Sequence, residues 1–255
     1  MQEGEGKMLP NARREQLLEL LKQQRYATIQ ELSRKIFVST ATVRRDLKVL
    51  EAAGLVHCTY GGVSIAPAEG KNVPLPLRQA EHVTVKQQIA RAVAALIAPH
   101  ETLMMDGSST AMHLCDFLSP EMDLTVFTYC VDTAAHLSRK GITAYCVGGQ
   151  YQPHSAIFTG YFAEKNFESV TADWVFLSSQ GLSLETGQIM DSSADETRLR
   201  QIMLRQARKS AFLCDSSKFD HAYPFILSSI EEMDVLISNE EIPALFHVKQ
   251  ILAGR

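Results

Sequence analysis

Short helices with one apolar face are predicted at the start of the chain. Four leucines at positions 17, 18, 20 and 21 share one side of a helix over residues 11–24, and Asn11 is its expected N-cap. Thr28 and Glu31 have the spacing of a capping box, which predicts that a second short helix begins there. Phe37 and Val38, which follow the second helix, are expected to form the turn into a third helix.

The third helix carries the pattern from which a function can be argued. It is expected to run from the N-cap Ser39 to about Ala53, and Gly54 ends it. Three apolar residues at i, i+4 and i+7 face the core: Val43, Leu47 and Leu50. The opposite side carries small, hydroxyl and basic residues: Ala41, Thr42, Arg44, Arg45 and Lys48. Arginine can form two hydrogen bonds to guanine, so this side suits a DNA major groove, although an ordinary solvated helix has the same pattern.

A hairpin with a glycine turn follows the third helix. Residues 55–59 and 63–65 are predicted to be strands, and Tyr60-Gly61-Gly62 the turn between them. Three short helices followed by such a hairpin are the components of a winged helix-turn-helix domain. We place this DNA-binding domain, called the head below, at residues 8–66.

Prolines interrupt the pattern between residues 67 and 80, which we predict to be a linker, partly extended through Pro74 and Pro76. In residues 81–255, called the body below, short apolar strands alternate with amphipathic helices. This alternation predicts an α/β domain with a largely parallel sheet covered by helices. Strands are expected at 102–105, 124–127, 142–147, 174–177, 211–214 and 235–237, and helices at 89–97, 111–118, 131–139, 195–207 and 241–252.

Polar residues and glycines are concentrated where the predicted strands end, in segments 106–110, 148–149, 178–181 and 215–219. Ligands of parallel α/β sheets bind at this edge, often beside a helix N-terminus, so segment 106–110 predicts an anion pocket. Lys218 is expected to meet a phosphate or carboxylate there. Each segment alone is more typical of a turn or a cap, but four at one sheet edge favour an effector-binding pocket.

Charge and cysteine content narrow the class of protein. Residues 1–66 hold ten Lys and Arg against seven Asp and Glu, a charge of +3, whereas residues 67–255 hold fifteen against twenty-two, a charge of −7. A basic head on an acidic body suits contact with DNA phosphates by the head alone. The five cysteines are widely spaced and form no C-x-x-C pair, so we expect no disulfide framework, no metal site and no cofactor.

The sequence also argues against a membrane protein. It has no run of eighteen apolar residues, and residues 1–10 lack the apolar segment of a signal peptide. We therefore expect a cytoplasmic protein without membrane contact. Either Met1 or Met8 is the native start.

One string in the head is specific: Val38-Ser39-Thr40-Ala41-Thr42-Val43-Arg44-Arg45-Asp46-Leu47, followed by Leu50-Glu51 and Gly61-Gly62. It closely resembles the N-terminal signature of the DeoR family of bacterial regulators, and the resemblance implies that the third helix is the recognition helix. Two wing positions depart from the family pattern, with His57 where arginine is frequent and Tyr60 where histidine is frequent. The residues expected to contact DNA are Thr28, Ser39, Thr40, Ala41, Thr42, Arg44, Arg45, Lys48, Tyr60 and Gly61.

The body carries a second set of matching residues: Asp106, Ser109, Thr110, Gly148, Gly149, Gly160, Asp173, Gly181, Glu196 and the string 215–219. They resemble the DeoR-type effector domain, which shares its fold with sugar-phosphate isomerases and coenzyme A transferases. The resemblance implies a phosphorylated sugar or related metabolite as effector, with its phosphate on residues 108–110 and Lys218 nearby. Thr128-Tyr129-Cys130 departs from the common Thr-Asn-Ser, and Ser108 from a common glycine. The expected effector-binding residues are Asp106, Gly107, Ser108, Ser109, Thr110, Thr128, Tyr129, Gly148, Gly149, Gln180, Gly181 and Lys218.

An enzyme and an architectural DNA protein are the alternatives. A sugar-phosphate isomerase with a DNA-binding head needs a general base, yet loop 178–181 has no acidic residue, and Asp106 and Asp215 are better explained as loop caps. An architectural protein needs no ligand pocket. We predict a transcription regulator, a repressor of sugar-metabolism genes, that binds a double-stranded DNA operator and a small-molecule effector and catalyses no reaction. One head buries little surface on DNA, so a homo-oligomer is expected, with dimer or tetramer left open.

Overall fold

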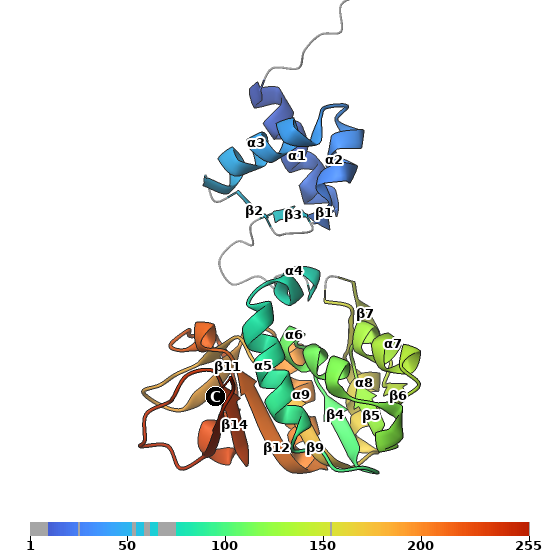
Figure 1. The fold of residues 1–255 in the computed structure, drawn as a ribbon, viewed down its shortest axis with the longest axis vertical. Helices are drawn as coiled ribbons and strands as arrows, with labels where there is room; N and C mark the ends of the chain where they lie inside the picture. The colour runs from blue at the N-terminus through green and yellow to red at the C-terminus, as the bar shows by residue number, and fades with distance from the viewer. Residues whose placement is uncertain are drawn as a thin grey trace, which may run out of the picture. The chain divides into compact units, whose positions relative to one another are not determined.

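The chain divides into two units, Met1–Glu81 and His82–Arg255; the first includes the head and the predicted linker, and the second includes the body from His82 onward. The computed structural model describes residues 10–24, 26–52, 55–58, 62–65, 75–153 and 155–254. Figure 1 shows the course of the chain, with the head in blue and the body from green to red. No helix in these ranges is both long and apolar enough to cross a bilayer.

The head is the predicted winged helix-turn-helix. Helices α1, α2 and α3 enclose an apolar core with a small antiparallel sheet of order β1-β3-β2. The core includes Leu17, Leu32, Val43, Leu47 and Val63, each at most 2 % exposed. The elements are α1 Pro10–Gln24, β1 Tyr26–Ala27, α2 Ile29–Lys35, α3 Thr40–Ala52, β2 Val56–Cys58 and β3 Val63–Ile65.

Two expectations about helix ends near the head are wrong. Helix α1 already includes Pro10, so Asn11 lies inside its first turn and is not the N-cap. Proline suits this position, because the first helical N–H has no intrahelical partner. The same rule explains helix α4, Leu75–Ala80, which lies within the predicted linker: Pro76 is in its first turn, so the extended conformation expected there is not adopted.

The body is built on a seven-stranded sheet in which every pair of neighbours is parallel, as predicted. The strand order is β15-β14-β12-β9-β4-β5-β6. The strands are β4 Thr102–Met105, β5 Thr125–Thr128, β6 Thr143–Cys146, β9 Ala172–Leu177, β12 Ala207–Cys214, β14 Val235–Ser238 and β15 Lys249–Leu252. Five of them are therefore adjacent from β12 to β6, and their carboxyl ends lie along one edge of the sheet.

Helices cover both faces of this sheet (Figure 1). On one face, α5, η1 and α7 contribute Ile89, Leu114 and Leu137 to a core with residues such as Leu103 and Val126. On the other face, α8 and α9 pack together, and α9 packs on β9 and β12. The helices are α5 Val83–Ala94, α6 Ser109–Met112, η1 His113–Phe117, η2 Pro120–Met122, α7 Val131–Arg139, α8 Tyr161–Glu168, α9 Ala194–Gln206, η3 Ser216–Lys218 and η4 Ile230–Glu232.

The predicted helix at 241–252 is wrong. Pro243 falls in its first part, and residues 249–252 form β15, which pairs with β14 and so satisfies its backbone in the sheet.

Two small antiparallel sheets were also not predicted. One is the hairpin of β7 Gln150–Gln152 and β8 Ile157–Thr159, and the other joins β10 Gly181–Leu182, β11 Gln188–Asp191 and β13 Phe225–Ser229.

Candidate DNA-binding surface and effector site

Helices α2 and α3 each begin at a residue whose side chain caps the first turn. The Thr28 hydroxyl accepts a hydrogen bond from the Glu31 N–H at 3.2 Å, and the Glu31 carboxylate accepts one from the Thr28 N–H at 2.8 Å. This confirms the capping box that begins α2, and these bonds hold the Glu31 carboxyl at a pKa below its usual value. The Ser39 hydroxyl likewise accepts from the Thr42 N–H at 3.2 Å at the start of α3.

The outward side of α3 is basic and available. Ala41, Arg44, Arg45 and Lys48 are exposed, as is Ser39, whereas Thr40 and Thr42 are half-buried. Within the described residues, no side-chain hydrogen bond or ion pair is formed by the three basic side chains of this helix, so their donors remain open for phosphates or base edges. Tyr60 and Gly61, the two wing residues expected to contact DNA, lie outside the described residues.

Asp46 positions the recognition helix, and sequence reasoning did not single it out for this role. It lies on the inward side of α3 with only 1 % exposure, and its carboxylate accepts from Arg13 Nε at 2.5 Å and Arg14 Nε at 3.3 Å. The hydrogen bond to Asp46 raises the pKa of the Arg13 guanidinium. A carboxylate on an apolar helix face requires a partner, so its position between Val43 and Leu50 was the available signal.

In the body, the predicted effector segments meet at one sheet edge. They follow β4, β5, β6, β9 and β12, which are neighbours in the sheet. The sheet order therefore brings together residues 106–110, 128–129, 148–149, 178–181 and 215–218, as expected for strand-end loops.

Asp106 joins two of these loops and is fully buried. Its Oδ1 accepts from the Ser108 N–H at 3.0 Å and the Ser108 hydroxyl at 2.5 Å. Its Oδ2 accepts from the Ser178 N–H at 2.9 Å and from Arg200 Nε at 2.9 Å. Protein donors therefore occupy both oxygens, and Asp106 holds the loops after β4 and β9 together.

Arg200, on α9, is the centre of a buried charge cluster that sequence reasoning missed. Besides Asp106, its guanidinium donates to Asp191 at 2.8 Å and to Glu196 at 3.0 Å. All four side chains are at most 7 % exposed, and the nearby acidic groups raise the Arg200 pKa further above its usual value, although burial opposes this. One guanidinium thus faces three carboxylates. The i,i+4 spacing of Glu196 and Arg200 was the only signal in the sequence.

Tyr129 points into this cluster. Its side chain is fully buried, and its hydroxyl donates to the Glu196 carboxylate at 3.4 Å. Burial raises the Tyr129 pKa well above its usual value. A Cβ on Gly107 would lie 2.8 Å from the Tyr129 ring and from Ile157, so Gly107 is required for packing.

The segment Ser108–Thr110 combines one used hydroxyl with two available ones. Ser108 is the N-cap of α6, and its hydroxyl accepts from the Ala111 N–H at 3.1 Å. Ser109 and Thr110 are 5 % and 2 % exposed, and within the described residues neither hydroxyl has a hydrogen-bond partner. They are the groups of this segment that remain open to a ligand.

Most of the other predicted effector residues have a structural role: a hydrogen bond, a backbone conformation that favours glycine, or close packing. The Thr128 hydroxyl accepts from the Cys130 N–H at 3.1 Å and is fully buried. Gly148 and Gly149 have φ of +71° and +125°, which favour glycine. A Cβ on Gly181 would lie 1.9 Å from the His221 carbonyl oxygen, so Gly181 serves packing. Gln180 is half-buried beside it.

Lys218 and Asp215 lie close in sequence but are not paired. The Asp215 Oδ1 accepts from the N–H and hydroxyl of Ser217, and its Oδ2 is buried without a hydrogen-bond partner in the described part of the chain. Lys218 is half-buried on η3, and no hydrogen bond or ion pair of its ammonium occurs among the described residues. Burial raises the pKa of the neighbouring Cys214 thiol.

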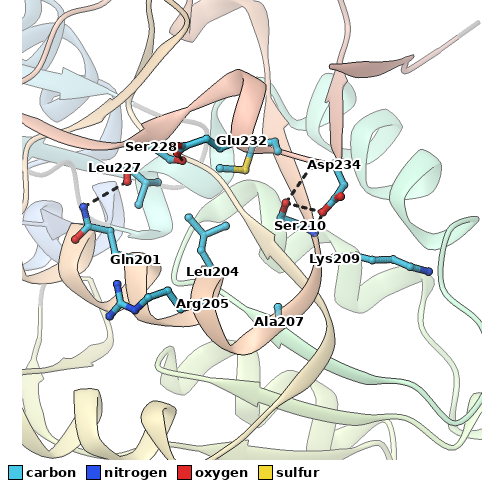
Figure 2. A pocket seen from close by; sticks show the side chains of 11 residues that line it. Gln201, Leu204, Arg205, Ala207, Lys209, Ser210, Leu227, Ser228, Glu232 and Asp234 are labelled. Carbon is cyan, nitrogen blue, oxygen red and sulfur yellow. Dashed lines mark hydrogen bonds between the residues drawn. The ribbon is translucent and has the colours of Figure 1, made fainter. Parts of the chain in front are cut away.

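A hollow of about 510 Å³ lies at the opposite edge of the sheet, at the amino ends of its strands (Figure 2). It is lined by residues at the amino ends of β12 and β14, including Ser210 and Asp234. The Asp234 carboxylate already accepts from the N–H and hydroxyl of Ser210, at 2.8 and 3.0 Å. Because these polar groups satisfy one another, the effector site is better placed at the carboxyl edge. No group of three or more His, Cys, Asp or Glu suited to a metal occurs in the described residues.

A winged helix with an open basic face, joined to an α/β body with loops gathered at one sheet edge, defines a DNA-binding regulator with a sensor domain. The comparisons with known proteins make this specific. A model of the DeoR-like helix-turn-helix domain matches residues 13–68, and a model of the DeoR C terminal sensor domain matches residues 81–240. The chain belongs to the DeoR family and is a transcription regulator, not an enzyme.

Curated relatives match over nearly the whole chain. The HTH-type transcriptional regulator GolR of Listeria innocua is 30 % identical over 97 % of both chains. The putative aga operon transcriptional repressor of Escherichia coli O157:H7 is 29 % identical over 91 % of this chain and 87 % of its own. The L-fucose operon activator of Haemophilus influenzae is 26 % identical over 91 % and 93 %. The resemblance seen in the sequence is confirmed.

Solved structures resemble the chain only distantly. Ribose 5-phosphate isomerase A from Methanocaldococcus jannaschii has a TM-score of 0.42 at 13 % identity over 55 % of each chain. The eIF2B delta protein of Chaetomium thermophilum has a TM-score of 0.45 at 15 % identity, over 93 % of this chain and 75 % of its own. Likenesses this weak carry no argument about function.

Proposed function

We propose that this regulator represses genes of carbohydrate metabolism and that a phosphorylated sugar, bound at the carboxyl edge of the body's sheet, is its effector. The observation that carries the effector proposal is the set of unsatisfied polar groups at this edge. The Ser109 and Thr110 hydroxyls and the Lys218 ammonium have no hydrogen-bond partner within the described residues, and Ser109 and Thr110 are residues with 5 % and 2 % exposure. Hydrogen-bonding groups that the fold leaves unused at one sheet edge are available to a ligand.

The phosphate is expected on one side of this site. Arg200 offsets only one of the three carboxylates around it, so the buried cluster repels an anion placed beside it. Free N–H groups at the start of α6, the two hydroxyls and Lys218 attract one. The phosphate would therefore bind between Ser109, Thr110 and Lys218, and Gly148, Gly149 and Gln180 would face the sugar.

The DNA-binding proposal rests on α3. Arg44, Arg45 and Lys48 would contact bases and phosphates, with Ser39, Thr40, Ala41 and Thr42 at the start of the helix. The Thr28 hydroxyl is used by the capping box, so Thr28 would act by fixing α2. Tyr60 and Gly61 would contact DNA from the wing.

Repression and sugar metabolism are supported by relatives. One relative is named a repressor of the aga operon, and another an activator of the L-fucose operon. Both names describe a protein that regulates one operon, but the first is named a repressor and the second an activator. A cytoplasmic location accords with a DNA operator as partner and with five cysteines that are all free thiols. We further propose a homo-oligomer, because paired heads are needed to read a symmetric operator.

A thermal-shift screen tests the effector proposal. The full chain would be heated with a panel of sugar phosphates, each beside its unphosphorylated sugar. A ligand at one hundred times its Kd stabilises the fold by about 2.7 kcal/mol, so the melting temperature should rise by several degrees. A rise with one phosphate and none with its parent sugar supports the proposal. Equal rises with both would show that the phosphate is not recognised.

A further inference from the structure

The β6 edge of the body is the most exposed aromatic region of the described chain. Strand β6 is the last strand of the seven-stranded sheet, so one of its sides has no neighbouring strand. Four aromatic side chains with large exposed fractions belong to β6, β7 and α8: Tyr145 at 54 %, Tyr151 at 47 %, Tyr161 at 67 % and Phe162 at 71 %. We call these four side chains and the open side of β6 the β6 surface.

The elements that carry these four side chains lie near the end of β6. Helix α8 is held against the end of β6, because Asn166 donates to the Val147 carbonyl at 2.6 Å. Phe162 precedes Asn166 by four residues and so lies on the same side of α8. Gln150 pairs with Thr159, which places β7, with Tyr151, beside the start of α8. Figure 1 shows β6, β7 and α8 at the same margin of the body.

The backbone of β6 is open on this side. The Val147 N–H donates inward to the Thr128 carbonyl at 3.0 Å. Because backbone groups alternate along a strand, the N–H groups of Ala144 and Cys146 point outward, and no partner for them occurs among the described residues. An open strand edge with exposed aromatic residues beside it is a template for pairing with another strand.

We propose that a second copy of this chain occupies the β6 surface, with the two β6 strands paired antiparallel across a two-fold axis. This inference rests on the proposed paired-head function and names the surface that would perform the pairing. An antiparallel pair of identical strands is itself two-fold symmetric, which is the symmetry that a dimer on a palindromic operator requires. A different partner would need its own matching edge, whereas a second copy always carries one.

The charges near the β6 surface and the exposed area of its aromatic side chains are both suited to pairing with a second copy of the chain. The charged residues of α8 nearest the aromatic side chains are Glu164 and Lys165, of opposite sign, so two copies do not repel each other through a single-sign patch. Tyrosine and phenylalanine are enriched at interface cores. With about 150–250 Å² per aromatic residue, the four exposed side chains offer roughly 500 Å², more than half of the ~800 Å² that each partner contributes to a standard interface.

Two measurements on the full chain test the proposal. The first is the mass in solution, by sedimentation, of the wild type and of a Tyr161→Glu/Phe162→Glu variant. Both side chains are mostly exposed, so the fold should be retained, which circular dichroism checks. The variant should shift to a smaller assembly, with at least a tenfold higher dissociation constant. Leu245→Glu is the control, because Leu245 is 59 % exposed and lies outside the β6 surface.

The second measurement is chemical cross-linking of the wild-type chain, in which the β6 surface is unchanged. Cys146 is an exposed thiol on β6. Because Ala144 and Cys146 carry the outward-facing groups, a centred antiparallel pair puts Ala144 of one copy opposite Cys146 of the other, and the two Cys146 Cα atoms would lie about 9 Å apart, from two residues at about 3.4 Å along the strand and about 5.5 Å across. A short bismaleimide should therefore give a covalent dimer, and Cys146→Ser should abolish it.

An unchanged mass in the double variant, together with no cross-link through Cys146, would overturn the β6 surface while leaving paired heads possible through another face. A wild type that is monomeric both alone and on operator DNA would instead overturn the paired-head function itself. A smaller variant with an intact fold, and a cross-link that Cys146→Ser removes, is the result we expect.

Discussion

Charged side chains that are buried and bonded serve the fold of this protein, whereas charged side chains without a partner among the described residues are available for binding. Asp46, Asp106 and Arg200 are almost fully buried and bonded to other side chains, so they hold elements in place. Arg45 on α3 and Lys218 on η3 form no ion pair with any described residue. A charge that the fold does not use is available for a ligand, and these two are the residues on which binding is expected to depend.

Removing the basic face of α3 should weaken DNA binding without changing the fold. Arg44 and Arg45 are exposed and point away from the apolar core. Arg45→Ala should cost about 1–3 kcal/mol of operator binding if the side chain reads a base, and Arg44→Ala/Arg45→Ala should cost more. A gel-shift titration measures this. Arg205→Ala, an exposed arginine of the body, is the matched control, and wild-type affinity in the double variant would refute the assignment.

Tyr129 predicts a pH dependence of stability. Its pKa in the folded chain is raised above the ordinary value by burial, so the folded state keeps its proton more strongly than the unfolded state does. The stabilisation is fully present below the unfolded pKa of about 10 and is lost as pH rises beyond it. Urea unfolding between pH 8 and 11 should show a steeper loss for the wild type than for Tyr129→Phe. Parallel pH curves would contradict the prediction.

At the scale of elements, the spacing of apolar and polar residues predicted those helices and strands that depend on local sequence. The capping box of Thr28, helix α3 and six of the seven strands of the parallel sheet follow from spacing alone. The helix expected at 241–252 fails because pairing of β15 with β14 is a tertiary contact that no local pattern records. The Arg200 cluster was missed for the same reason: Asp106 and Arg200 are 94 residues apart. The strand-end rule found the loops of the candidate site but not the side chains that hold them.

Gly181 illustrates an element that depends on one missing Cβ. It begins β10, and a Cβ there would lie 1.9 Å from the His221 carbonyl oxygen. Gly181→Ala should therefore push the two backbones apart and cost about 1–3 kcal/mol of stability. Chemical denaturation measures the loss. Gly148→Asn is the control, because Gly148 has open space around it and asparagine tolerates its positive φ of +71°; an equal loss in both variants would mean that crowding at Gly181 is not the cause.

The whole molecule is a basic head joined to an acidic body, and regulation requires that the body's state change what the head can do. An effector can do this only if it binds one state of the protein more tightly than the other. Helix α4, Leu75–Ala80, lies in the segment predicted to be a linker and belongs to the first unit of the chain.

Lys218 provides the test of this coupling. Its side chain lies on the strand-end loop after β12, outside the head, and no described residue pairs with it. Lys218→Ala should weaken binding of the screened sugar phosphate by about tenfold or more, the loss of one charge-assisted hydrogen bond of about 1.5–3 kcal/mol. Binding to the operator without effector should stay unchanged, since the recognition helix is untouched. Calorimetry with wild type, Lys218→Ala and the exposed-lysine control Lys165→Ala separates the two effects. Equal effector affinities in all three would exclude Lys218 from the site, whereas a loss of operator binding by Lys218→Ala alone would show that this lysine supports the fold and does not sense the ligand.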